Sequence, residues 1–366
     1  MEKSMKYIER IENLISDIST TVVDFSSERT HGTPPTQVSS EFLTNKEQGD
    51  WAEKTLMDGI NNHSKEYIAV KYGRDDDIIA GEDGFKEFYN DYQKELDEVG
   101  KRPDLLIFRK TDFPYENIYN ISHLPLSELD IIVPKALCGI EVRSSAFLID
   151  KYEEFMREKQ ERLSIEIMLT KQEILSNYSE LLKRKDKQLY DIICLLNEEN
   201  LHVISFRCPT WRSNDELAKL SELLKIIKKN LSEITKRTFL SITPKVEDLK
   251  VVYNWIKRYN VPHFYVQVFF DKAYGISFEK ILTLLSEPDL EGKKYFIESD
   301  VKNQNKTTIK IHANEEANIL NKVYLPEHYS VMKELGRGRL LFYVKFKNSM
   351  AVINDAEFKK LFDIKL

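Results

Sequence analysis

Three acidic residues lie where the ends of predicted elements could bring their carboxylates together. Glu53 is on a predicted helix (QGDWAEKTL), Asp104 begins a predicted strand (KRPDLLIF) and Glu141 is on the next one (GIEVRSS). Carboxylates that share a core repel one another and are costly to desolvate unless a cation lies between them. Mg²⁺, which binds one or two carboxylates together with water and phosphate, is the natural counter-charge. Such an ion could activate water for in-line attack on a phosphodiester.

Each acid taken alone has an ordinary explanation. A single Pro-Asp pair is commonly a surface turn, a helix glutamate is commonly solvated, and Glu-x-Arg on a strand is commonly an ion pair. The order of the three motifs, each in a fitting structural context, favours the metal-site hypothesis.

The hydrophobic patterns predict a three-layer α/β core that would position these acids. The core elements expected, in chain order, are an amphipathic helix over 1–28, a helix from about Asn45, strands over 66–73, 102–108 and 137–145, a helix over 247–259 and a buried strand over 263–270. Between the third and the last of these strands, Phe147 to Arg237 is rich in Lys, Glu, Leu and Ile. We expect two or three long helices there, around one short strand within 197–213.

Five regions follow from this pattern. They are an N-terminal helix and loop (1–40), a first core part (41–145), a helical insertion for DNA recognition or dimerisation (146–237), a second core part (238–290) and a C-terminal α+β region (291–366).

Composition excludes several classes of protein. No window approaches eighteen uncharged apolar residues, and the charged N-terminus lacks an apolar secretory core, so we expect a cytoplasmic protein without membrane spans. The three cysteines (Cys138, Cys194 and Cys208) form no Cys-x-x-Cys pair, which argues against a disulfide framework or zinc cage. The net charge of −6 means that a polyanion partner must be met by local basic patches.

The acidic motifs resemble those of the PD-(D/E)xK nuclease superfamily. More narrowly, the stretches QGDWAE, KRPDLLIF, GIEVRSS and VEDLKVVYNWIKRYNVPHFYVQVFF resemble type II restriction endonucleases, most of all AccI and its relatives. The resemblance implies an α/β nuclease core with a mixed central sheet flanked by helices. It also implies Mg²⁺-dependent hydrolysis of both DNA strands at a short, near-palindromic site, with the AccI precedent being GTMKAC. By the same resemblance, Asp104 and Glu141 are metal ligands and Glu53 is an outer ligand.

The family's lysine position is occupied by Arg143 in this sequence. Arginine can stabilise a pentacovalent phosphate but does not deprotonate near neutral pH, so it cannot act as a base. Either Arg143 acts electrostatically, or Lys245 supplies a displaced ammonium; a surface position at a helix start is an equally good explanation of Lys245.

Two loops carry arginines suited to reading base edges. They hold Arg207, Trp211 and Arg212 in FRCPTWRS, and Arg337 and Arg339 in GRGRLLFYVKFK. A palindromic duplex favours a homodimer. The apolar stripes of the insertion could pair across the two-fold axis, although burial within one subunit explains them equally well.

Two other functions remain open from the sequence. One is a structure-selective repair nuclease of the same fold. The other is a catalytically inactive DNA-binding protein, which the Arg143 replacement favours.

Overall fold

The computed structural model describes residues 6–74, 78–300 and 306–362. The chain divides into two compact units: residues 1–149 together with 241–366, and residues 150–240. The second unit is therefore inserted into the chain of the first.

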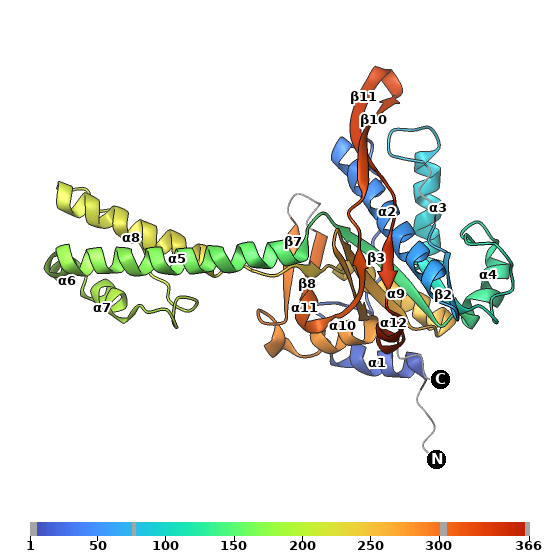
Figure 1. Cartoon of the computed structure of the whole chain (residues 1–366), viewed down its shortest axis with the longest axis horizontal. Coiled ribbons are helices and arrows are strands. Elements are labelled where there is room, and N and C mark those ends of the chain that lie inside the picture. The colour runs from blue at the N-terminus through green and yellow to red at the C-terminus, as the bar shows by residue number, and fades with distance from the viewer. Residues whose placement is uncertain (1–5, 75–77, 301–305, 363–366) are drawn as a thin grey trace, which may run out of the picture. The chain divides into compact units, whose positions relative to one another are not determined.

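A seven-stranded mixed sheet in the order β1-β2-β3-β5-β6-β9-β12 forms the centre of the first unit (Figure 1). Its strands are β1 (Tyr67–Lys71), β2 (Leu105–Arg109), β3 (Cys138–Ser145), β5 (His263–Phe269), β6 (Lys272–Ser277), β9 (Asn318–Val323) and β12 (Ala351–Ile353). β1, β2 and β3 pair antiparallel, whereas β3 and β5 are parallel. A parallel pair needs a long crossover, and here the connection contains the inserted unit and helix α9 (Val246–Tyr259).

Helices cover both faces of this sheet. α2 (Ser40–His63) and α12 (Asp355–Leu361) pack on one face, where Trp51, Leu56 and Phe358 share a core with Ile140 and Val266. On the other face lie α9 and α10 (Phe278–Leu285), with α1 (Tyr7–Asp17) packed against α10. The expected mixed α/β architecture is thus confirmed.

Further elements complete the first unit. The first unit also contains the α-helices α3 (Phe85–Glu98), α4 (Leu126–Ile132) and α11 (Ala313–Glu316). A second sheet has the order β4-β8-β7, and its strands are β4 (Ser241–Ile242), β7 (Tyr295–Asp300) and β8 (Lys306–His312). A hairpin of β10 (Glu327–Leu335) and β11 (Arg339–Lys347) packs along α2 (Figure 1).

The inserted unit is helical. It consists of α5 (Ile149–Asn177), α6 (Ser179–Lys185), α7 (Lys187–Leu195) and α8 (Asp215–Ile234). α5 and α8 share one apolar core and are joined by an ion pair of 2.9 Å between Lys159 and Glu233.

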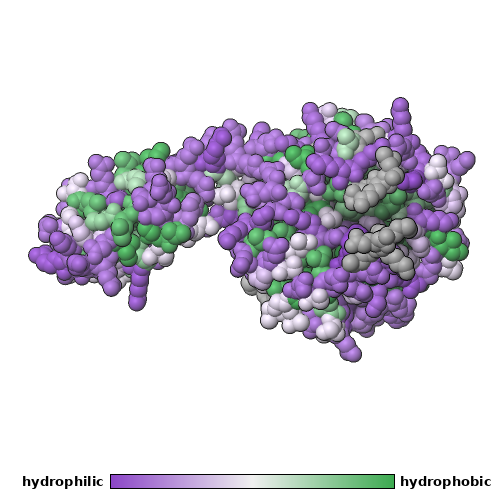
Figure 2. Space-filling model, turned by 90° about the horizontal axis from the view of Figure 1, so that it is seen from below, coloured by the Kyte–Doolittle hydropathy of each residue, from purple (hydrophilic) through white to green (hydrophobic). Residues whose placement is uncertain are grey.

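The apolar stripes predicted in the insertion are mostly buried within this unit. Buried or partly buried are Ile174, Leu181, Leu182, Leu217, Leu220 and Leu224. Ile165 and Leu169 are the exception, because each is 60% exposed. Figure 2 shows hydrophobic residues gathered among hydrophilic ones on the visible face of this unit.

Two expectations about local structure were wrong. The N-terminal helix ends at Asp17 instead of continuing to 28, because a run of Ser, Thr and Val (19–23) follows it and such residues favour turns and extended backbone. Residues 197–213, all of them described, contain no strand. There the side chains of Asn197 and Asn200 bond to nearby backbone groups, which stabilises turns in place of a strand ladder.

Candidate active site

The three predicted acids line one cavity. Glu53, Asp104 and Glu141 lie with Arg143 and Lys245 around a space of about 490 Å³. Glu53 comes from the middle of α2, Asp104 from the residue before β2, and Glu141 from the centre of β3. The structure therefore brings together every catalytic and metal-ligand candidate that we derived from the sequence.

Backbone contacts fix Asp104 at the start of β2. Its carbonyl accepts hydrogen bonds from the N–H groups of Tyr72 (2.9 Å) and Gly73 (3.0 Å). Its Oδ2 accepts a hydrogen bond of 2.6 Å from the Val142 N–H on the neighbouring strand. The side chain of Asp104 is thus hydrogen-bonded to β3, at the residue that follows Glu141.

Four charged side chains form a compact network beside Asp104. Lys101 Nζ lies 2.6 Å from Glu141 Oε1 and 2.8 Å from Asp248 Oδ2. Arg143 Nη2 lies 3.0 Å from the same Glu141 oxygen and 2.8 Å from the same Asp248 oxygen. Each cation therefore bridges both carboxylates.

Glu141 and Asp248 stay ionised within this network. Burial disfavours their charge, but Lys101 and Arg143 together outweigh burial, so the pKa of each carboxyl is lowered. The same contacts raise the pKa values of Lys101 and Arg143, although burial opposes this. All four groups are charged at neutral pH.

Asp104 and Glu53 have the opposite electrostatics. Burial raises the pKa of Asp104, and repulsion from Glu141 and Glu53 raises it further. Burial also raises the pKa of Glu53 to about 7, with Asp50 and Glu141 adding to the effect. The free protein thus concentrates negative charge that its own cations do not fully balance.

This imbalance predicts that Glu53→Gln raises stability in the presence of EDTA. A carboxyl with a raised pKa destabilises the folded state above that pKa, and the destabilisation disappears as the pH falls toward 4.5. At pH 8 we expect the melting temperature of the variant to exceed that of the parent by at least about 2 °C, and the difference to shrink toward pH 5. Thermal unfolding across this pH range measures it.

Glu47→Gln is the matched control on the same helix, since Glu47 forms an ion pair of 3.1 Å with Lys345. Its removal should not raise the melting temperature. An equal gain in both variants would contradict the assignment of repulsion to Glu53.

The acid cluster fits a divalent cation held by two carboxylates. Glu141 Oε2 is buried and has no hydrogen-bond partner among the described residues. The carboxylate of Asp104 is repelled by those of Glu141 and Glu53. Within the described ranges, no three His, Cys, Asp or Glu side chains are grouped closely enough to hold a metal together. Mg²⁺ commonly takes one or two carboxylates and completes its shell with water and phosphate, so Asp104 and Glu141 suffice as protein ligands.

Sequence reasoning missed two members of the network, Lys101 and Asp248. Lys101 lies three residues before Asp104, in Gly-Lys-Arg-Pro-Asp. The Pro-Asp pair in this stretch indicated Asp104 as a candidate, and it gave no indication of Lys101. Asp248 lies in the first turn of α9 and is fully explained by the helix dipole when the sequence is considered alone. Lys245 is the N-cap residue of this helix.

The predicted DNA-binding residues occupy two places. In the inserted unit, Arg207 and Arg212 are exposed, whereas Trp211 packs partly against the helical core. In the first unit, Arg337 lies in the turn Gly336–Gly338 between β10 and β11, and Arg339 begins β11.

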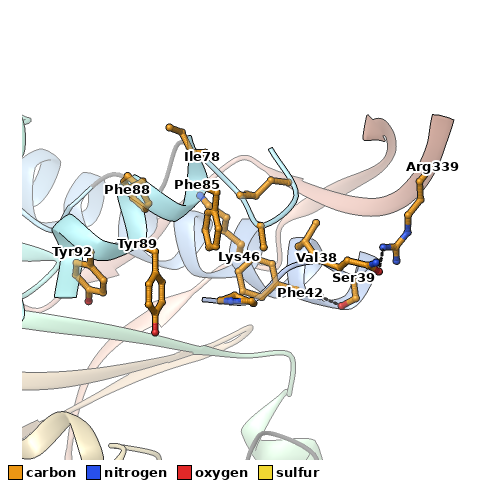
Figure 3. Close-up of a pocket in the computed structure, with 14 residues that line it drawn as sticks. Val38, Ser39, Phe42, Lys46, Ile78, Phe85, Phe88, Tyr89, Tyr92 and Arg339 are labelled. Carbon is orange, nitrogen blue, oxygen red and sulfur yellow. Dashed lines mark hydrogen bonds between the residues drawn. The ribbon is translucent and has the colours of Figure 1, made fainter. Parts of the chain in front are cut away.

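Arg339 also lines a second, largely apolar cavity of about 550 Å³ (Figure 3). Its guanidinium donates a hydrogen bond of 2.7 Å to Gln37 Oε1. The aromatic side chains around this cavity are Phe42, Phe85, Phe88, Tyr89 and Tyr92. Phe42, Lys46 and Tyr92 also line the acid-containing cavity, so the two cavities are neighbours.

A mixed sheet that presents carboxylates and cations to one cavity is consistent with an α/β nuclease. The sequence model of the AccI restriction endonuclease family matches residues 5–365. The chain therefore belongs to the AccI restriction endonuclease family, which makes it a type II restriction endonuclease, a site-specific deoxyribonuclease.

The family match confirms the resemblance inferred from the motifs, and it identifies DNA as the binding partner. Restriction endonucleases generally use divalent metal ions. No curated protein and no solved structure shows significant similarity to the chain. No helix in the described part of the chain has the length and apolarity to cross a membrane.

Proposed function

We propose that this chain is a Mg²⁺-dependent endonuclease with a PD-(D/E)xK core that hydrolyses both strands of DNA at a short, near-palindromic site. The observation that carries the proposal is the cavity in which Asp104 and Glu141 lie beside the cations Lys101 and Arg143. The elements α2, β1, β2, β3, α9 and β5 follow one another along the chain with other helices and β4 between them, and β5 is parallel to β3; this arrangement supports the proposed core.

In this proposal Asp104 and Glu141 hold the ion, and Glu53 acts as an outer ligand. When bound, Mg²⁺ acidifies water and stabilises charge on the phosphate. Arg143 contributes charge and directed N–H donors to the phosphate, which is a role that needs no proton transfer. Lys245 at the same cavity stays a second candidate for the role of the family's lysine.

DNA is held by arginines outside this cavity. Arg207, Arg212, Arg337 and Arg339 are proposed to contact the duplex, with Trp211 supporting the loop between Arg207 and Arg212. Ile165 and Leu169, exposed on α5, are proposed to contribute to a homodimer interface. A two-fold dimer would place one active site on each strand of a palindrome. The site of the AccI precedent, GTMKAC, is the first sequence to test.

Digestion of a sequenced plasmid tests the proposal directly. We expect discrete fragments with Mg²⁺ and none with EDTA, and sequencing of the fragment ends gives both the site and the cut position. Addition of GTMKAC sites to a resistant plasmid tests the named sequence. A lack of discrete fragments with both Mg²⁺ and Mn²⁺ would contradict the proposal.

A further inference from the structure

Lys101 occupies the position from which a cation can reach both Glu141 and the cavity. Its ammonium has three N–H donors, of which two point to Glu141 Oε1 and Asp248 Oδ2. The side chain is 15% exposed, and it lines the same cavity as Asp104. One donor is therefore left for a phosphate oxygen or for water in that cavity.

The backbone around Lys101 fixes this position. The Lys101 N–H donates a hydrogen bond of 2.9 Å to the Val251 carbonyl on α9. The preceding residue, Gly100, has a left-handed conformation (φ +92°) and lies directly against the backbone of α9. Lys101 is thus attached to the helix that also carries Asp248.

Asp248 contacts both cations that lie beside Glu141. Its Oδ2 lies 2.8 Å from Lys101 and 2.8 Å from Arg143, whose nitrogens also contact Glu141. Without this second carboxylate, each long side chain would keep only Glu141 as its anchor and would be free to adopt other rotamers. Asp248 therefore restrains the direction in which the two cations point.

We propose that Lys101 is a catalytic residue, whose ammonium donates a hydrogen bond to the phosphate under attack, and that Asp248 is the positioning residue that orients Lys101 and Arg143. This inference rests on the proposed function of the cavity and adds to it. It assigns the role of the family's lysine to Lys101, which precedes Asp104 in the sequence, in preference to Lys245.

The test measures single-turnover cleavage of a duplex that carries the cleavage site mapped in the plasmid digest. Lys101→Met is expected to slow cleavage at least about 100-fold, as for loss of one donor to a reacting oxyanion. Its affinity for the same duplex, measured with Ca²⁺ in place of Mg²⁺, should fall less than about 10-fold, because a single phosphate contact is lost. Lys101→Arg should recover part of the rate.

A double variant separates positioning from general stability. Asp248→Asn alone should slow cleavage roughly 10- to 100-fold. If Asp248 acts by orienting Lys101 and Arg143, adding Asp248→Asn to Lys101→Met should slow cleavage by a clearly smaller factor than Asp248→Asn does alone, because only the orientation of Arg143 is then still to be lost. A merely structural role of Asp248 would multiply the two losses.

Lys257→Met, at an exposed position of α9, is the matched control and should cleave at the parental rate. Parental cleavage by Lys101→Met would overturn the catalytic role, and multiplied losses in the double variant would overturn the positioning role. If Lys101→Met does not fold, the cleavage rates of Lys101→Arg and Asp248→Asn test the proposal instead. Cleavage at the parental rate by both of these variants would overturn it. Absence of cleavage by the parent would instead contradict the proposed function.

Discussion

Asp104→Asn and Glu141→Gln should each abolish plasmid cleavage and yet change stability in opposite directions. Both substitutions are nearly isosteric and remove one negative charge from the pair proposed to hold the metal. Loss of either carboxylate should lower the cleavage rate by about 10³-fold or more, since the ion and the oriented water depend on both. DNA binding should persist, because the proposed duplex contacts are made by other residues.

The opposite effects on stability follow from the pKa shifts. The pKa of Asp104 is raised by burial and by its acidic neighbours, so its charge destabilises the folded protein above that pKa. Asparagine removes this cost, and the melting temperature in EDTA at pH 8 should rise. The pKa of Glu141 is lowered because Lys101 and Arg143 outweigh burial, so its charge is stabilising at neutral pH and that stabilisation is lost as the pH falls. Glutamine should lower the melting temperature, since it leaves buried cations partly unpaired.

Plasmid digestion and thermal unfolding of the same preparations measure both effects. Asp112→Asn is a suitable control, since Asp112 is exposed just beyond the other end of β2 and should change neither property. Retained cleavage in Asp104→Asn or Glu141→Gln would remove the residue from the metal site. A fall in melting temperature with Asp104→Asn would contradict the repulsion inferred for the free protein.

The central strands were predictable because their sequences carry a strong local pattern. β3 alternates between Ile140 and Val142, which belong to the core shared with α2, and the charged residues Glu141 and Arg143, which line the cavity together with the edge of Val142. β5 is buried at every position, as the continuous apolar run predicts. The acids could be found for the same reason, since each belongs to an element with a readable pattern.

The missed strands lack such a pattern. β9 (NILNKV) and β12 (AVI) are short strands at one edge of the central sheet, and only their pairing with β6 and with each other defines them. β10 exposes most of its residues, so burial gives it little periodicity. These strands depend on partners that are distant in the sequence, which no local pattern reports.

The contact between Lys101 and Asp248 could not be predicted from the sequence for a similar reason. They are 147 residues apart, with the whole inserted unit between them. Each has an adequate local explanation, as a polar residue before a strand and as an acid in the first turn of a helix. The one local signal was Gly100, a glycine directly before the Lys-Arg-Pro-Asp stretch, which suggests a close approach of the backbone.

Gly100→Ala should cause the largest loss of stability among the substitutions considered. A Cβ atom at this position would lie 2.4 Å from both the Trp255 nitrogen and the Val251 oxygen, which are backbone atoms of α9 and cannot rotate away. The left-handed conformation adds its own strain for alanine. We expect the free energy of unfolding to fall by at least about 3 kcal/mol.

Gly292→Ala provides the matched control, because Gly292 has a similar conformation (φ +79°) and nothing lies within 4 Å of the position that an alanine methyl group would take there. It should cost only about 1 kcal/mol, so urea unfolding of the two variants isolates the effect of the backbone contact. In Gly100→Ala, displacement of α9 would also separate Asp248 from Lys101. Cleavage by this variant, measured well below its unfolding temperature, should therefore be slower than cleavage by the parent. Gly292→Ala should cleave at the parental rate. Equal stability losses in the two variants would show that the segment before Asp104 is not held against α9, and the geometry of Lys101 would lose its structural basis.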